Sequence, residues 1–190
     1  MSLGKLFSVV VVSAVVMGVT AGSAHATVLT NFTGSTYTGS VSLRENFYIE
    51  IHGEGFTTVC SSSNIGGSVT QHGAGVTAQI SISTLDFSEC NYPVTVLSKG
   101  SLEIHATSGG NGTVTSNGMS ITVHGPFGIN CMYQTSNTDI GTLTGTYNFQ
   151  AVIDADGALV PRTGDSIFCG SYGELTRGWK FSTPWSIVVD

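Results

Sequence analysis

Apolar and polar residues alternate along several short segments of the chain. The alternation is uninterrupted from Val76 to Ser83, and the same two-residue period occurs in segments 47–51, 101–106, 119–124 and 142–152. In the last segment it places these residues on one side: Leu143, Gly145, Tyr147, Phe149 and Ala151. A period of two is typical of β-strands that bury one face, and we find no 3.6-residue period over a helical length. The pattern therefore predicts an all-β protein.

Glycine-rich turn signals separate these segments. They are Gly109–Gly112, Asn117-Gly118 and Asp156-Gly157, and Asn-Gly and Asp-Gly supply the positive φ angles that two-residue hairpins need. About ten short strands joined in this way, without a change of composition between them, indicate a single domain. We expect an antiparallel β-sandwich (Ig-like or jelly-roll-like) or a partly closed barrel over residues 27–190.

The first 26 residues have the pattern of a secretory signal peptide. Lys5 gives a positive start, Leu6–Val19 is an apolar stretch, and Ala24-His25-Ala26 is a small-x-small cleavage site. The apolar stretch is shorter than the roughly 20 residues that a membrane-spanning helix needs. We therefore predict a secreted protein, with the periplasm as the alternative location. The segment Thr27–Ser40, rich in Thr, Ser and Gly, is expected to be a loosely attached lead-in.

Composition narrows the range of partners. Only 9% of the 190 residues are charged, and six Lys and Arg against twelve Asp and Glu give a net charge of −6. A protein that follows nucleic-acid phosphates needs the opposite sign, so nucleic acid is excluded as a partner. The mature chain also lacks a further segment long and apolar enough for a transmembrane helix, which argues against an integral membrane protein. Serine and threonine, rather than charged residues, are expected to cover the surface.

Four cysteines occur in the mature part, and we expect all four to be oxidised. An even number of cysteines behind a signal peptide favours disulfides, and none of the spacings resembles the C-x-x-C of a zinc or redox site. Four cysteines allow three connectivities. We favour Cys60–Cys90 with Cys131–Cys169, because sequential pairs close short loops between neighbouring strands.

No motif for catalysis or metal binding is found. After the predicted signal peptide the nucleophile patterns G-x-S-x-G and S-x-x-K are absent, and the acidic residues form pairs in sequence only. The histidines of the mature part lack a metal-ligand spacing, and His105 and His124 occupy the polar phase of their strands: His52, His72, His105 and His124. Asp154-Ala155-Asp156-Gly157 lacks the further ligands of a calcium loop, so a hairpin turn explains it. We predict no enzyme activity, no catalytic residue, no metal and no cofactor.

Aromatic residues gather near the end of the chain. Trp179 and Phe181 share one strand face, so we expect both in the core. Trp185 follows Pro184, which cannot donate to a β-ladder and so marks an edge or a strand start. An exposed indole at that place could contact a sugar ring or an apolar surface, which makes Trp185 a candidate ligand contact.

Cysteine spacing and Gly/Thr-rich strand motifs give a resemblance to a known family. The motifs are Cys60-Ser61-Ser62-Ser63, Gly67-Ser68-Val69-Thr70, Leu85–Cys90, Cys131-Met132-Tyr133, Leu143–Tyr147, Phe168-Cys169 and the closing Trp179…Thr183-Pro184. Over most of Cys60–Val189 the chain resembles the PraB-like "protein activator of alkane oxidation" family of small exported bacterial β-proteins. The resemblance implies a role in growth on hydrocarbons, in biofilm or at the cell surface, and it provides no active site to carry over.

We therefore expect a non-catalytic secreted protein that acts at a cell-surface, biofilm-matrix or hydrocarbon–water interface. Its expected partners are hydrocarbon droplets, matrix polymer or the cell surface. A surface covered by hydroxyls suits this role because burying a charge costs far more than burying a hydroxyl that finds a hydrogen bond. Two alternatives stay open: an extracellular carbohydrate-binding module that uses Trp185, and a surface subunit that assembles through edge strands. The sequence leaves the oligomeric state undetermined.

Overall fold

A computed structural model describes residues 28–31, 33–73, 76–146, 148–155, 157–163, 168–184 and 186–189, with the backbone alone for 71–73 and 76. The predicted signal peptide lies outside these residues. The described residues form strands joined by turns and one short 3₁₀ turn. The elements are β1 (Leu29–Asn31), β2 (Ser40–Gly53), β3 (Phe56–Gly73), β4 (Val76–Cys90), β5 (Val94–Ser98), β6 (Ser101–Ala106), β7 (Gly112–Asn117), β8 (Ser120–His124), η1 (Pro126–Gly128), β9 (Asn130–Gln134), β10 (Thr138–Thr144), β11 (Val152–Asp154), β12 (Ala158–Thr163), β13 (Tyr172–Thr183) and β14 (Ile187–Val189).

Eight strands close into an antiparallel barrel. Around the ring the order is β11-β10-β7-β6-β4-β3-β2-β13, and pairing of β11 with β13 completes it. The closing ladder matches Val152–Asp154 of β11 with Gly178–Lys180 of β13. Of the two predicted architectures the structure shows the barrel rather than the sandwich. The all-β class is confirmed.

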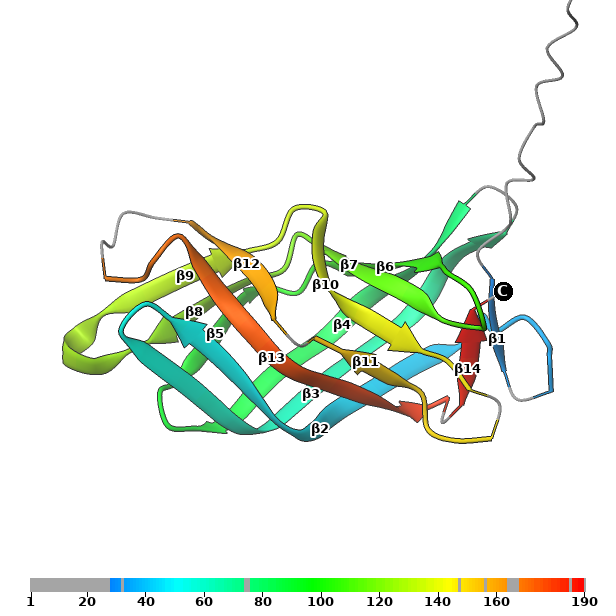
Figure 1. The fold of residues 1–190 in the computed structure, drawn as a ribbon, viewed down its shortest axis with the longest axis horizontal. Coiled ribbons are helices and arrows are strands. Elements are labelled where there is room, and N and C mark those ends of the chain that lie inside the picture. Colours follow the sequence, from blue (N-terminus) through cyan, green and yellow to red (C-terminus); the bar gives the residue numbers. More distant parts are fainter. Residues whose placement is uncertain are drawn as a thin grey trace, which may run out of the picture.

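A second set of strands extends the wall at one end of the barrel. Strand β13 pairs with β11 along one part of its edge and with β12 along another, where Ala158–Pro161 face Tyr172–Leu175. From β12 the sheet continues through β9 and β8 to β5. Figure 1 shows the resulting elongated molecule, with β1 and β14 at one end and the β2–β3 and β8–β9 connections at the other.

Inward-facing side chains of both sets of strands form one hydrophobic core. Trp179 and Phe181 of β13 are buried in it, as predicted. The Trp179 indole donates a hydrogen bond to Ser63 Oγ at 2.9 Å, and the Ser63 amide donates to Glu45 Oε2 at 2.8 Å. These bonds satisfy polar groups that would otherwise destabilise the core.

The lead-in segment forms part of a small separate sheet. Strand β1 pairs antiparallel with β14, and the register joins Leu29 to Val189 and Asn31 to Ile187. Leu29 is fully buried. The first and last described strands therefore meet at the same end of the barrel (Figure 1).

Two expectations about connections are wrong. Segment 142–152 is not one continuous strand, because β10 ends at Thr144 and β11 begins at Val152. Phe149 lies in the intervening loop and is 73% exposed instead of sharing the buried face of Leu143. Tyr147 is outside the described residues.

The Asn117-Gly118 and Asp156-Gly157 turns also do not join hairpin partners. Strands β7 and β8 belong to different parts of the sheet, and β11 and β12 both pair with β13 instead of with each other. Of the three turns predicted from the sequence, only Gly109–Gly112 joins strands that pair with each other, β6 and β7. A positive-φ turn reverses the chain, but whether the two strands then pair depends on contacts distant in sequence.

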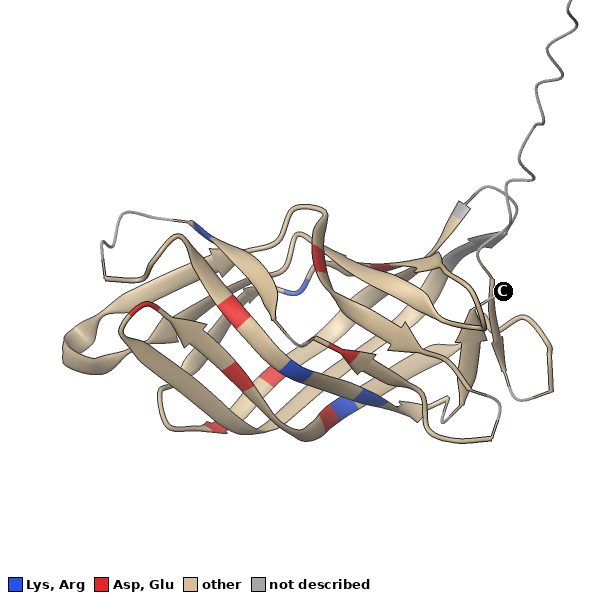
Figure 2. Ribbon diagram, viewed as in Figure 1, with Lys and Arg blue, Asp and Glu red and all other residues tan. Residues whose placement is uncertain are grey.

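Charged residues are sparse on the barrel. Figure 2 shows long stretches of ribbon without charge, including the whole β8–β9 hairpin, where Ser120–Gln134 contains no Asp, Glu, Lys or Arg. Within the described part of the chain, no helix is long and apolar enough to cross a membrane.

Candidate functional site

The four cysteines form two disulfides with the favoured connectivity. Cys60 of β3 is bonded to Cys90 at the end of β4, and Cys131 of β9 is bonded to Cys169 in the β12–β13 connection. Such bonds are consistent with an oxidising compartment outside the cytosol. Their role is structural, because each one ties a strand to a neighbouring strand or loop.

The predicted ligand contact Trp185 lies outside the described residues, as does Asp156. Trp185 therefore stays a prediction, and the structure adds nothing for or against it. The side chain of His72 is likewise not described.

The three other histidines that follow the predicted signal peptide are His52 and His124, which are partly buried, and His105, which is exposed. His52 lies between Glu50 and Thr57, with its ring nitrogens 3.0 Å from an oxygen of each. His124 contacts Thr95 and Asn130 in the same way. Among the described residues no three His, Cys, Asp or Glu side chains gather closely enough to hold a metal ion.

A pocket lined by aromatic rings lies at the end of the molecule opposite β1 and β14. It has a volume of about 340 Å³ and is formed by the β2–β3 turn, the β8–β9 loop and the β12–β13 connection. We call it the aromatic end; it comprises Phe56, Pro126, Phe127, Ile129 and Phe168, with Glu54 and Gly55 at the β2–β3 turn. Glu54 is the only ionisable side chain among the described residues of this lining.

Phe127 stands at the tip of the β8–β9 loop and is fully exposed, at 102% of its reference area. Its φ of 57° lies in the left-handed region, which a bulky residue rarely adopts. Two backbone hydrogen bonds fix the loop, from Gly125 N to Ile129 O and from Ile129 N to Pro126 O. The exposed ring is thus carried by a short, internally bonded loop.

Phe56 forms the base of the aromatic end. Its ring meets the Tyr92 ring edge to face, with centroids 5.6 Å apart. A Cβ on Gly125 would approach the Phe56 ring to 2.7 Å, so a side chain there would push the ring and the β8–β9 loop apart. Phe56 is therefore packed in place beneath the loop that carries Phe127.

Phe168 forms the third side of the aromatic end and is 60% exposed. The next residue, Cys169, is fully buried and bonded to Cys131. Its carbonyl accepts a hydrogen bond from the Tyr133 hydroxyl at 3.2 Å. Burial raises the pKa of Tyr133, and the nearby Arg162 charge opposes that rise. The disulfide and the tyrosine together hold the chain beside Phe168.

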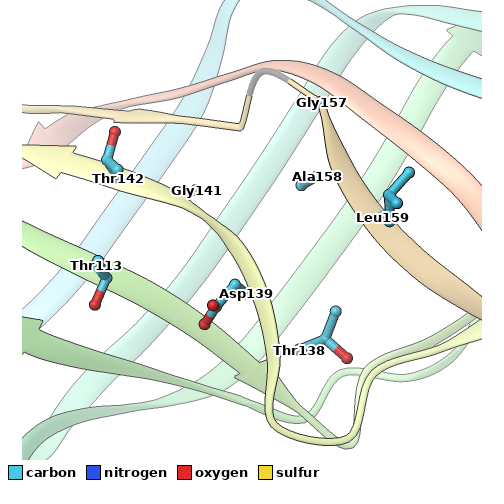
Figure 3. A pocket seen from close by; sticks show the side chains of 8 residues that line it. All are labelled: Thr113, Thr138, Asp139, Gly141, Thr142, Gly157, Ala158 and Leu159. Atoms are coloured by element: carbon cyan, nitrogen blue, oxygen red, sulfur yellow. The ribbon is translucent and has the colours of Figure 1, made fainter.

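A second depression lies on the side of the barrel, where β10 faces β12 without pairing. Its volume is about 470 Å³. We call it the β10–β12 cleft; it is lined by Thr113, Thr138, Asp139, Gly141, Thr142, Gly157, Ala158 and Leu159. Figure 3 shows hydroxyl and carboxylate side chains on the β7 and β10 side, with Ala158 and Leu159 opposite them on β12.

The alternation of apolar and polar residues predicts neither depression. The tetrapeptide Gly125-Pro126-Phe127-Gly128 between two alternating segments is a signal that could have indicated an exposed turn with Phe at its tip. The β10–β12 cleft has no comparable signal, because it depends on β13 pairing with β12 along one part and with β11 along another.

Comparison with known proteins gives no relative: no family model, curated protein or solved structure matches this chain. The fold and the disulfides define an all-β, disulfide-bonded barrel protein. The resemblance to the PraB-like family stays a prediction.

Proposed function

We propose that this protein is exported and non-catalytic, and that it attaches to apolar surfaces such as hydrocarbon droplets through its aromatic end. The observation that carries the proposal is the complete exposure of Phe127 beside the largely exposed Phe168 in one pocket. Exposed apolar groups that gather in one place mark interaction sites more often than single ones do. The unusual backbone of Phe127 supports the same conclusion, since such conformations gather at functional sites.

The energetics favour an apolar partner. Full burial of a phenylalanine side chain contributes about 1.5–3 kcal/mol, and the two exposed rings lie on the same end of the molecule. The β8–β9 hairpin brings no charged side chain that would have to be dehydrated. Phenylalanine also lacks the polar atom by which Tyr and Trp bond to sugars, so an oil or lipid-like surface suits this end better than a glycan.

Hexadecane partitioning tests the proposal. The purified, disulfide-bonded protein is shaken with hexadecane and buffer, and its depletion from the buffer is measured. We expect Phe127→Ser to reduce the partition constant about tenfold or more, which corresponds to the lost burial of one ring. Phe149→Ser is the matched control, because Phe149 is 73% exposed but lies in the β10–β11 loop outside the aromatic end.

Two results would contradict the proposal. One is depletion of the unmodified protein no greater than that of a charge-matched control protein. The other is an equal loss in Phe127→Ser and Phe149→Ser, because general surface hydrophobicity would then explain adsorption. In both cases circular dichroism of the recovered protein shows whether the fold is retained.

A further inference from the structure

The β10–β12 cleft results from the way in which β13 changes partner. Strand β11 pairs with β10 only through Thr142–Thr144. Strand β12 pairs with a different part of β13, Tyr172–Leu175. The preceding part of β10, from Thr138 to Gly141, therefore faces β12 across a gap that no strand fills (Figure 3). This gap is separate from the aromatic end and is lined by different residues.

One wall of the cleft offers polar groups to a ligand. The Asp139 carboxylate and the Thr113 and Thr142 hydroxyls make no hydrogen bond with other described residues, while Thr138 Oγ1 accepts one from the Ser136 amide. Asp139 and Thr142 are exposed. A carboxylate can accept hydrogen bonds from two hydroxyls at once, and each threonine can donate or accept.

The other wall is aliphatic. Leu159 is 52% exposed and lies beside Ala158 on β12. A ligand that fits both walls has hydroxyls along one side and C–H groups along the other, which is the character of a sugar ring. The volume of about 470 Å³ is within the range of small-molecule sites.

Charge narrows the ligand class further. Among the described residues that line the cleft, Asp139 is the only ionisable one, and its negative charge disfavours phosphate, sulfate and uronate groups. No three His, Cys, Asp or Glu side chains among the described residues gather there closely enough to hold a metal ion. A neutral sugar fits both walls and carries no negative charge for Asp139 to repel.

We propose that the β10–β12 cleft binds a neutral sugar unit of a polysaccharide, with Asp139 accepting its hydroxyls and Leu159 packing on its C–H face. This inference does not depend on the proposed attachment to apolar surfaces. If both hold, the protein joins a neutral glycan to an apolar surface.

Amide chemical shifts of the ¹⁵N-labelled protein test the site. The probes are cello-, manno-, malto- and chito-oligosaccharides, with oligogalacturonate as the anionic comparison. We expect at least one neutral oligosaccharide to shift the amides of β10 and β12 with millimolar affinity, and oligogalacturonate to leave them unchanged. Single sites built from a few hydrogen bonds and one aliphatic contact have such weak affinities.

Two variants with matched controls locate the binding. Asp139→Asn is expected to weaken it about tenfold or more, since hydrogen bonds to a charged group are the strong ones. Asp86→Asn makes the same chemical change on β4, outside the cleft, and should bind as the unmodified protein does. Leu159→Ser should also weaken binding, while Leu97→Ser, which alters a residue 56% exposed on β5, should not.

The proposal is overturned if no neutral oligosaccharide shifts the cleft amides, or if Asp139→Asn binds as tightly as Asp86→Asn. Stronger binding of oligogalacturonate would also overturn it. Phe127→Ser should leave sugar binding unchanged, so the two proposals can fail separately.

Discussion

Tyr133 shows how a single side chain is fitted into this barrel. Its ring is 1% exposed, although its hydroxyl is polar. A Cβ on Gly53 would come within 2.9 Å of that hydroxyl, and one on Gly173 within 3.0 Å of the ring. Glycines on β2 and β13 therefore make room for the ring, and the bond to the Cys169 carbonyl satisfies the hydroxyl.

Tyr133 should make the protein sensitive to alkaline pH. Burial raises the pKa of Tyr133 above the 10.0 of an unhindered tyrosine, so the unfolded chain loses this proton at a lower pH than the folded protein does. Its contribution to stability is complete below about pH 10 and is lost as the pH rises through the raised value. Urea unfolding at a series of pH values measures this as a fall in the free energy of unfolding above pH 10.

Tyr133→Phe is the comparison. Near neutral pH we expect it to lower the free energy of unfolding by about 1 kcal/mol, through loss of the hydrogen bond. Above pH 10 its stability should fall less steeply than that of the unmodified protein. Tyr37, whose pKa burial also raises, is present in both proteins. Parallel pH profiles would show that Tyr133 does not contribute to the alkaline loss.

At the scale of elements, alternation predicts strands well where one face is buried continuously. Segments 76–83 and 101–106 lie in β4 and β6, and residues 120–124 of the third segment form β8, with Ile80, Ile104 and Ile121 in the core. The pattern fails at 142–152, because the chain leaves the barrel after Thr144. A Cβ on Gly145 would come within 2.1 Å of the Gly110 carbonyl oxygen, so a contact distant in sequence shapes the departure.

The candidate sites were harder to foresee than the strands, for a physical reason. The aromatic end combines three connections from different parts of the chain, and the β10–β12 cleft depends on β13 changing partner. Alternation describes which face of a strand is buried and contains no information about which loops meet. The cysteines are the exception, because their number and spacing limit the possible pairings.

The two disulfides should differ in their effect on the aromatic end. The bonds join residues separated by 38 positions (Cys131–Cys169) and 30 positions (Cys60–Cys90). Replacing either pair by alanines should therefore lower the free energy of unfolding by a similar amount, about 3–4 kcal/mol. Only Cys131→Ala with Cys169→Ala should also reduce hexadecane partitioning, because Phe168 is next to Cys169.

Partitioning is measured at a temperature at which both double variants are folded by circular dichroism. Cys60→Ala with Cys90→Ala is the matched control for stability. An equal loss of partitioning in both double variants would show that the disulfide does not act by holding Phe168.

For the whole molecule, closure of the ring depends on the short ladder between β11 and β13. Gly178 lies in this ladder with a φ of 140°, and a Cβ there would come within 2.0 Å of the Ile153 carbonyl oxygen. A residue with a side chain would have to push the two strands apart. Closure thus depends on glycine at this position.

Gly178→Ala should open the barrel locally. We expect a loss of about 3 kcal/mol or more in the free energy of unfolding, from backbone strain and broken ladder bonds. Hydrogen exchange should show loss of protection at the β11 amides, Val152–Asp154. Gly34→Ala is the control: its φ is 75° but no atom lies within 4 Å of a Cβ, so we expect a loss of about 1 kcal/mol. Similar losses in the two variants would argue against crowding at the ladder.

The elongated shape with aromatic residues at one end has a consequence for how the protein would cover a droplet. If the β8–β9 end enters the oil, the barrel axis points away from the surface, and β1 and β14 face the water (Figure 1). The adsorbed layer would then be as thick as the molecule is long, and the sides of neighbouring barrels would face one another. Crowding along those sides, rather than the affinity of the phenylalanines, would set how many molecules a given area of oil can carry.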